Sequence, residues 1–425
     1  MADTFTLLKK NAVWYALSIV VTGLAAFGGI IFTKQNLDAS SFVHFNLQLN
    51  TAMLISMVAL GWFGQSINRF YHGMQGVLHR RAIFNIATVI SCTVSIPLFV
   101  LWGIIFKINT AWVFPIIFIW VNALQYSFLI CRQAALEASQ STLSEIIRSG
   151  SIIVFLALPY VFHYKVSETY YWISWISSYA LAAFYLFITE AYTSQGISTI
   201  KKLEITPEFK LSIKKMLHFG LPLSLWLLCS YVFLYSDRWY LVSAGYNMVE
   251  TSNYVAVADI MMRGTGFMFS PIVSAAYPLL SRMFDSKDLL NVKVVIIKVI
   301  KWEVLMMLGA IIGFLALHKV VFSLLKIKDN TNNLFIWVGV LLLVFQSLWQ
   351  ISAMLHKVAE LQLRTGLLMI GNIASLALTY SLFYFVVKPQ TMIGVSVCFG
   401  AGTIVYVVFC LFLFKYLSFA NSNQQ

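Results

Sequence analysis

Long apolar runs follow one another along almost the whole of this 425-residue chain, and they limit what it can fold into. The hydrocarbon core of a bilayer is about 30 Å thick, and a helix of about 20 apolar residues crosses it. Hydrophobic residues make up 60% of the chain and charged residues 11%, against about 45–50% and about 25% in soluble domains. So few polar groups cannot cover a water-exposed surface. A soluble enzyme, a disordered chain, a nucleic-acid-binding protein and a secreted disulfide scaffold are therefore excluded.

Twelve apolar runs lie between charged or turn-rich breaks, and each predicts a membrane-spanning helix. The predicted spans are residues 12–32, 42–63, 82–106, 111–130, 149–162, 170–189, 217–235, 251–279, 302–318, 333–355, 366–387 and 391–414. The predicted fold class is an all-α polytopic membrane protein with about twelve transmembrane helices. The longest outer loop is expected at 236–250. Glu303 and Lys301, at the start of the ninth span, are expected to snorkel toward the interface.

The lysines and arginines are distributed unevenly over the predicted loops. With the N-terminus inside, twenty of the 29 fall on the inner side, eight on the outer side, and Arg263 falls inside a span. Positive residues of short loops collect on the cytoplasmic side of a membrane. The bias therefore predicts that both termini are cytoplasmic. It also accounts for the net charge of +13, which forms no basic stripe that could bind nucleic acid.

The two halves of the chain resemble each other. The long inner loop 190–216 divides the twelve spans into two sets of six, and three short segments recur in the same order on both sides of it. These pairs are residues 38–43 with 250–255, 68–70 with 281–283, and 125–136 with 350–361. Each half starts inside and has an even number of spans, so we expect two parallel six-helix repeats around a central cavity, an architecture typical of transporters. The expected organisation is an N-terminal lobe at 1–200, a cytoplasmic linker at 201–216 and a C-terminal lobe at 217–425.

The eighth predicted span carries charged groups inside the membrane. Asp259 and Arg263 lie on one helical line with Ser270 and Ser274, and a charge at the bilayer centre costs about 2.5–3.5 kcal/mol on insertion scales. Such a stripe must face another helix or a water-filled cavity. The i,i+4 spacing lets Asp259 and Arg263 pair. Two interpretations stay open: the pair staples helices together, or Arg263 receives an anion, because its guanidinium suits forked contacts with phosphate.

Milder polar groups recur on two other spans. Asn122 and Gln125 lie in the fourth span, and Gln346 and Gln350 lie in the tenth. Small polar residues at helical spacing serve as packing surfaces or, on the alternative interpretation, as ligands for a polar substrate. The sequence shows no catalytic constellation, no metal-ligand spacing and no glycine-rich phosphate loop. We therefore expect neither enzymatic activity nor a cofactor.

Several short segments resemble one family of membrane proteins. Residues 220–223 (Gly-Leu-Pro-Leu) open the seventh span, residues 236–238 (Ser-Asp-Arg) close it, and residues 277–282 (Tyr-Pro-Leu-Leu-Ser-Arg) end the eighth. With Asn68-Arg69-Phe70-Tyr71 after the second span, they resemble the oligosaccharide flippases of the multidrug/oligosaccharidyl-lipid/polysaccharide exporter (MOP) superfamily. Ser41 and Asn253 stand where that family commonly has a glycine.

The resemblance implies a transporter of the bacterial inner membrane. It would move undecaprenyl-diphosphate-linked oligosaccharide units outward, for O-antigen or a related surface polysaccharide. The implied partners are the lipid bilayer, the lipid-linked oligosaccharide, a polysaccharide polymerase and a chain-length regulator. A diphosphate needs a cationic partner and sugars need hydroxyl and amide groups, which the polar positions above would supply.

Three other functions compete with this interpretation. A cation-coupled drug exporter of the same superfamily would typically carry an acidic residue in an early helix, whereas the first predicted span has none. A polysaccharide polymerase has a similar composition but a long outer loop, whereas the longest one predicted here is 236–250. A non-transporting scaffold would not need charges inside the membrane.

Overall fold

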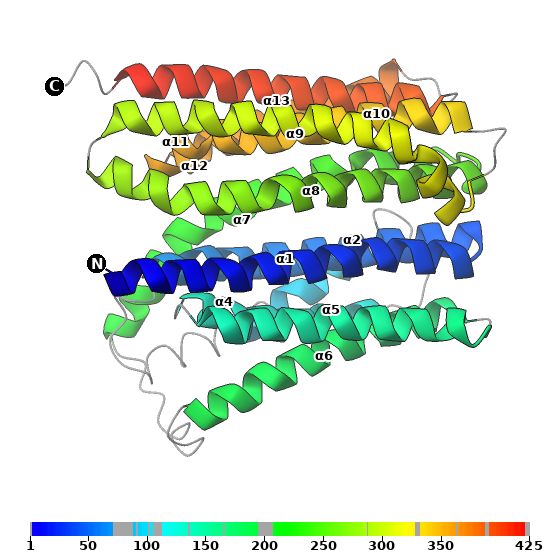
Figure 1. Cartoon of the computed structure of the whole chain (residues 1–425), viewed down its shortest axis with the longest axis horizontal. Helices are drawn as coiled ribbons and strands as arrows, with labels where there is room; N and C mark the ends of the chain where they lie inside the picture. The colour runs from blue at the N-terminus through cyan, green and yellow to red at the C-terminus, as the bar shows by residue number, and fades with distance from the viewer. Residues whose placement is uncertain are drawn as a thin grey trace. The chain divides into compact units, whose positions relative to one another are not determined.

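In the computed structural model, every regular element of the described residues is a helix (Figure 1). The structure describes residues 2–70, 88–90, 92–100, 103–104, 113–134, 137–164, 166–193, 207–286, 288–327, 332–362, 364–386 and 391–420. The helices of the first half are α1 (Ala2–Asn36), α2 (Ala39–Phe70), α4 (Val113–Ala134), α5 (Ala138–Val161) and α6 (Glu168–Thr193). Those that follow are α7 (Pro207–Ser243), α8 (Met248–Asp285), α9 (Leu289–Leu324), α10 (Asn332–Leu355), α11 (Lys357–Leu361), α12 (Thr365–Phe385) and α13 (Met392–Ala420).

Ten helices of the described part are long and apolar enough to cross a membrane, which confirms the predicted all-α polytopic class. They are α1, α2, α4, α5, α6, α7, α9, α10 with α11, α12 and α13. α8 is long enough at 38 residues but is not among the ten, although it was predicted as the eighth span. Of the third predicted span, 82–106, the structure describes residues 88–90, 92–100 and 103–104, and these are helical.

The contacts divide the chain into two compact units. Unit 1 contains residues 1–37 and 44–228, and unit 2 contains residues 38–43 and 229–425. The boundaries between the units therefore fall between α1 and α2, within α2 and within α7. The expected linker at 201–216 overlaps α7, which begins at Pro207, so residues 207–216 are helical. The predicted parallel arrangement of two lobes stays a prediction.

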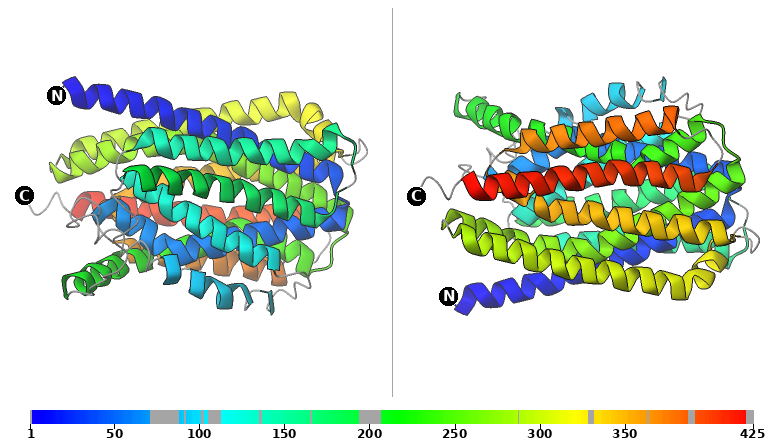
Figure 2. Two further views of the ribbon diagram at one scale, coloured as in Figure 1. Left: turned by 90° about the horizontal axis from the view of Figure 1, so that it is seen from below. Right: turned by 90° about the horizontal axis from the view of Figure 1, so that it is seen from above.

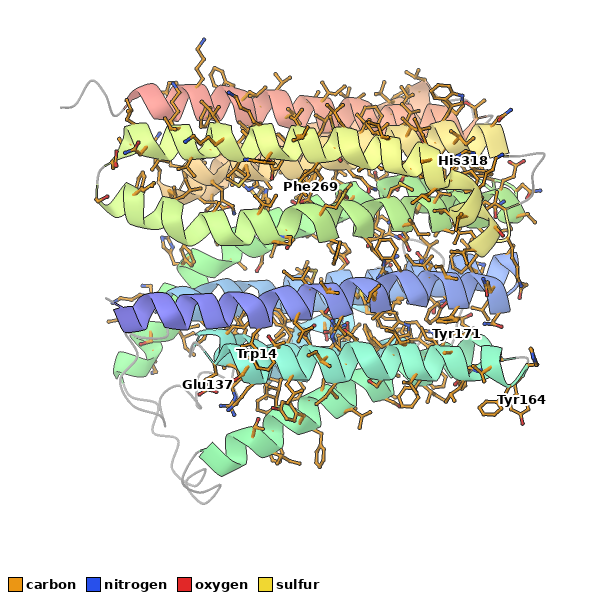
Figure 3. All side chains as sticks on the ribbon, viewed as in Figure 1. Trp14, Glu137, Tyr164, Tyr171, Phe269 and His318 are labelled. Atoms are coloured by element: carbon orange, nitrogen blue, oxygen red, sulfur yellow. The ribbon has the colours of Figure 1, made fainter. Side chains whose placement is uncertain are left out.

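Aromatic side chains form the core of unit 1. Phe118 on α4 lies edge-on to Trp172 and Tyr179 on α6, with ring centroids 5.9 and 5.1 Å apart. Tyr171, labelled in Figure 3, is fully buried, and its hydroxyl donates to the backbone oxygen of Phe32 at 3.4 Å. Phe45 on α2 packs on the same Tyr171 ring at 5.8 Å. One aromatic cluster thus ties α1, α2, α4 and α6 together.

In unit 2, α13 packs against both α10 and α12, and the right-hand view of Figure 2 shows it (red) between them. Gly402 on α13 allows this close packing, because a Cβ there would collide with Thr379 Oγ1 on α12. Small residues let membrane helices approach closely. Phe233 on α7 stacks on Phe399 at 5.0 Å and on Trp349 at 4.8 Å. Residues 229–243 of α7 therefore pack within unit 2.

Two expectations from the sequence are wrong. The outer loop predicted at 236–250 is only the connection 244–247, because α7 continues to Ser243 and α8 begins at Met248. Gly245, with φ of 73°, makes the turn there, a backbone conformation that glycine adopts at little cost. Glu303 does not snorkel: it lies within the 36-residue helix α9, and its side chain is fully buried.

Candidate functional site

The most buried stretch of α8 carries the intramembrane charge predicted from the sequence. Every residue from Thr251 to Met261 is buried, and Asp259 has no exposed surface. Phe269, further along the same helix and labelled in Figure 3, is also fully buried. α8 packs against α9 and α10 within unit 2. A polar helix surrounded in this way avoids lipid, which explains why a segment less apolar than the ten spanning helices can still lie among them.

Asp259 forms an ion pair with Arg238 of the neighbouring helix α7. The Arg238 Nη2 lies 3.0 Å from Asp259 Oδ1, and both side chains are fully buried. The guanidinium also lies over the ring of Tyr235, 4.3 Å from its centroid. Removing one partner of such a pair leaves an uncompensated charge and costs about 3–5 kcal/mol. This pair therefore fixes α7 against α8.

A second carboxylate, Asp237, lies beside the Arg238–Asp259 pair. Tyr254 on α8 donates its hydroxyl to Asp237 Oδ2 at 2.8 Å, and the backbone N–H of Arg238 donates to Oδ1 at 2.8 Å. Ser396 on α13 donates to the Tyr254 oxygen at 3.4 Å. We call Asp237, Arg238, Tyr254 and Asp259 the α7–α8 charge cluster. Its two carboxylates and one guanidinium bring three ionisable groups into a region without solvent.

The guanidinium of Arg238 is incompletely hydrogen-bonded. Its Nε and Nη1 atoms are buried and have no hydrogen-bond partner among the described residues. Buried polar groups are hydrogen-bonded in the great majority of cases, so an unsatisfied guanidinium needs an explanation. It indicates that the α7–α8 charge cluster can accept a further hydrogen-bond acceptor, such as a water molecule.

Arg263 follows Asp259 by one turn of α8, about 6 Å along the helix axis. Its side chain is half-buried, and its Nε has no hydrogen-bond partner among the described residues. No carboxylate in the described part of the chain forms an ion pair with it. Tyr231 and Tyr235 of α7, whose rings stack at 4.8 Å, lie within electrostatic range of Arg263. Arg263 is thus a partly accessible cation beside an aromatic surface.

The pairing expected from the sequence is corrected by these contacts. The i,i+4 spacing suggested Asp259 with Arg263, but the carboxylate of Asp259 forms its ion pair with Arg238. Arg238 was expected in an outer loop, and instead lies inside α7.

The remaining predicted residues divide between the two units. In unit 2, Ser270 is exposed on α8, while Gln346 is buried and Gln350 half-buried on α10, which packs against α8. The Oε1 of Gln346 has no hydrogen-bond partner among the described residues. The side chain of Ser274 lies outside the described residues.

Gln125 and Asn122 lie on α4 in unit 1. Gln125 is buried and donates to Glu145 Oε1 at 3.1 Å, while Asn122 is half-buried. Glu145 in turn accepts from Arg148, whose Nη1 donates to the hydroxyl of Tyr179 at 3.2 Å. We call Gln125, Glu145, Arg148 and Tyr179 the unit 1 network. Every member of it has a partner within the unit.

The sequence reasoning missed Arg238 and the two tyrosines beside it. Tyr231, Tyr235 and Arg238 are spaced by four and three residues, so they share one face of a helix. The spacing that revealed the stripe on α8 would therefore have revealed this one, had α7 been extended beyond residue 235. Among the described residues, no group of three or more His, Cys, Asp or Glu side chains could hold a metal ion.

Known proteins of the same fold are membrane transporters. An inward-facing MATE family multidrug resistance transporter of the MOP superfamily is similar, with a TM-score of 0.69 and 14% identity over 95% of this chain and 96% of the other. An outward-facing structure matches with a TM-score of 0.70 and 13% identity over 98% and 96%. A mutant MATE transporter of Vibrio cholerae matches with a TM-score of 0.62 and 12% identity over 98% of both chains. At these identities the likeness shows the fold alone.

A family model identifies the sequence more narrowly. The model of the polysaccharide biosynthesis protein family matches residues 8–284, which is more than half of the chain. The chain therefore belongs to this family of the MOP superfamily, as the resemblance in the sequence predicted. No curated relative matches at a significant level.

Proposed function

We propose that this protein is a flippase that moves an undecaprenyl-diphosphate-linked oligosaccharide from the cytoplasmic to the periplasmic face of the bacterial inner membrane. Alternating access of the two predicted lobes would carry the polar headgroup across. The units would serve O-antigen or a related surface polysaccharide. Membership of the polysaccharide biosynthesis family supports the substrate class, and the transporter fold supports the mode of action.

The observation that carries the proposal is Arg263. It is a permanent cation in the membrane-spanning region that pairs with no described carboxylate, since Arg238 neutralises Asp259. A diphosphate crossing a low-dielectric region needs such a partner, and a guanidinium offers forked hydrogen bonds to it. Ser270, Gln346 and Gln350 of the same unit, with Ser274, remain the proposed contacts of the sugars. Gln125 and Asn122 remain proposed contacts in unit 1.

A deletion strain tests the substrate class. Loss of the gene should abolish the long surface polysaccharide and leave lipid-linked units on the inner face of the membrane. A strain without a redundant flippase that still makes normal polysaccharide would refute the proposal. Export of single units that are never lengthened would instead favour a polymerase, although the short connection 244–247 in place of a long outer loop argues against one.

The proposed orientation has both termini in the cytoplasm. Cysteines introduced at residues 194–206 should be protected from a membrane-impermeant thiol reagent applied from outside, whereas one at Asn247 should react. Labelling at residues 194–206 with protection at Asn247 would show the opposite orientation and contradict the proposed one.

The second candidate function is multidrug export, because the similar solved structures are MATE multidrug transporters. It predicts drug sensitivity of the deletion strain with unchanged polysaccharide. Helix α1 carries its sole acidic residue, Asp3, at its first turn and none in its apolar part. A cation-coupled drug exporter would typically carry an acidic residue within an early helix, and α1 has none in its apolar part.

A further inference from the structure

A buried carboxylate on α9 lies outside the site described above. The buried residues of α9 are Val292, Ile296, Glu303, Phe314 and Phe322, which form one face of the helix. Glu303 is the only ionisable one of the five, and its side chain has no exposed surface. α9 packs on α8 and α10, so these helices cover it. An acidic residue therefore occupies a position where packing favours an apolar one.

Neither oxygen of the Glu303 carboxylate has a hydrogen-bond partner among the described residues. On α9 itself, the nearby cations Lys298 and Lys301 are exposed, so they lie on other faces of the helix. Trp302, the preceding residue, is 62% exposed, as expected for an aromatic residue at a membrane interface. Glu303 thus lies near the inner end of the apolar part of α9, but out of reach of water.

The charged groups on the packed helices are also placed away from Glu303 or already engaged. Counting from the short connection before Leu289, Glu303 is level with about residue 271 of α8, so Arg263 lies roughly 12 Å further along the axis and Arg282 further still in the other direction. α10 carries no charged residue. His356 and Lys357, just beyond its end, both contact Glu360, at 3.0 and 2.7 Å.

Burying a charged carboxylate without water or a partner costs several kcal/mol of free energy. Burying the neutral acid costs much less. The carboxyl group therefore holds a proton while α9 lies against α8 and α10. If α9 separates from them, water reaches the group and the proton can leave. We propose that Glu303 is a proton-binding site whose occupancy is coupled to the packing of α9 on α8 and α10.

The proton-binding site would give the transport cycle a proton-dependent step. Only this role of Glu303 in export rests on the proposed function. The carboxylate takes up one proton from the inner aqueous phase to become the neutral acid, and releases it when α9 moves away. Low pH should thus favour the packed form, and high pH the separated form. The binding of the proton itself requires no substrate and can be measured without one.

A hydrophobic carbodiimide tests the site on the purified full-length protein in lipid bilayers. The reagent, dicyclohexylcarbodiimide, reacts with protonated carboxyl groups in apolar surroundings and leaves a stable N-acylurea adduct. Mass spectrometry should find the adduct on Glu303, with a yield that falls about tenfold per pH unit above its titration midpoint. Glu303→Gln should abolish the adduct at that position. The matched control is Glu250→Gln at the exposed start of α8, which should leave labelling of Glu303 unchanged.

Infrared spectroscopy provides a readout that does not depend on access of the reagent. The carbonyl band of a protonated carboxylic acid should be present at neutral pH and disappear on alkalinisation, and Glu303→Gln should lack this change over the same pH range. A band that Glu303→Gln leaves unchanged would overturn the proposal. So would folded Glu303→Gln protein that exports normally, because this variant is permanently neutral. Neither result would touch the proposed substrate, which the deletion strain tests separately.

Discussion

Each unit contains an arginine that is paired with a carboxylate. The two arginines differ in how many of their guanidinium nitrogens have hydrogen-bond partners. In unit 1, Arg148 binds Glu145 three residues earlier on the same helix and also donates to Tyr179. The side chains of Arg148 and Glu145 are 12% and 15% exposed. In unit 2, Arg238 binds Asp259 on another helix, and both are fully buried. Two nitrogens of the Arg238 guanidinium have no hydrogen-bond partner among the described residues.

This difference indicates that the unit 1 network stabilises the fold, whereas the α7–α8 charge cluster has hydrogen-bond donors that remain to be satisfied. A network whose members all find partners rigidifies a fold, whereas a partly satisfied one is costly unless something completes it. The unit 1 network is complete by itself, so we expect it to hold α4, α5 and α6 together. The α7–α8 charge cluster is incomplete and lies one helical turn from Arg263. Arg263 itself pairs with no described carboxylate, so unit 2 is where we expect the diphosphate to bind.

The largest effect is expected from Arg238→Ala. The change leaves Asp259 and Asp237 buried without a counter-charge, and should destabilise the protein by about 3–5 kcal/mol. Protein level in the membrane and export should both collapse. Replacing both partners, Arg238→Leu with Asp259→Leu, removes one of the two stranded carboxylates, while Asp237 keeps its hydrogen bonds from Tyr254 and the backbone. The double variant should therefore recover part of the protein level. Quantitative immunoblotting and thermal unfolding in detergent measure this, and a single variant as stable as wild type would show that the pair is not buried as described.

Arg263→Ala should affect export while sparing the fold. Arg263 is half-buried and pairs with no described carboxylate, so its removal strands no charge. Surface polysaccharide per folded protein should fall at least about tenfold, which corresponds to about 1.4 kcal/mol of lost interaction. Arg263→Lys keeps the charge but loses the fork, and should retain part of the export. If instead Arg263→Ala protein is lost from the membrane, Arg263 has a structural role.

The smallest effect is expected from Arg148→Ala in unit 1. The change removes hydrogen bonds to Glu145 and Tyr179, but the Glu145 side chain is 15% exposed and can be hydrated, so about 1–3 kcal/mol of stability should be lost. Export per folded protein should stay near the wild-type value. Measuring both quantities beside those of Arg263→Ala sharpens the comparison of the units. A stable Arg148→Ala protein without export would place the functional cation in unit 1 instead.

Most of the fold could be predicted from the sequence because apolar runs of about 20 residues are unambiguous. The eighth span was predicted from its apolar run, and the helical spacing within it showed that Asp259 and Arg263 share one face. Residues 236–238 (Ser-Asp-Arg) were taken for the end of a span because two charges in a row usually mark water. Their burial depends on Tyr254 and Asp259, and no local pattern shows which residues of another helix will face them.

Glu303 illustrates the same limit. Its neighbours Lys301 and Trp302 are exposed, and along the sequence they suggest a helix end at the interface. Only the packing of α8 and α10 on α9 shows that the next residue turns inward. From the sequence we could propose the helix of the candidate site and its cation, Arg263. The ion pair between Arg238 and Asp259 could not be predicted.

Reconstitution tests the central claim most directly. Purified wild-type protein and Arg263→Ala protein, matched for folded amount, would be placed in liposomes with an undecaprenyl-diphosphate oligosaccharide. Enzymatic modification of the sugars from outside would then measure how fast they cross. We predict rapid crossing with wild-type protein and at least about tenfold slower crossing with Arg263→Ala. Equal rates for the two proteins, or no crossing above protein-free liposomes with either, would contradict the account.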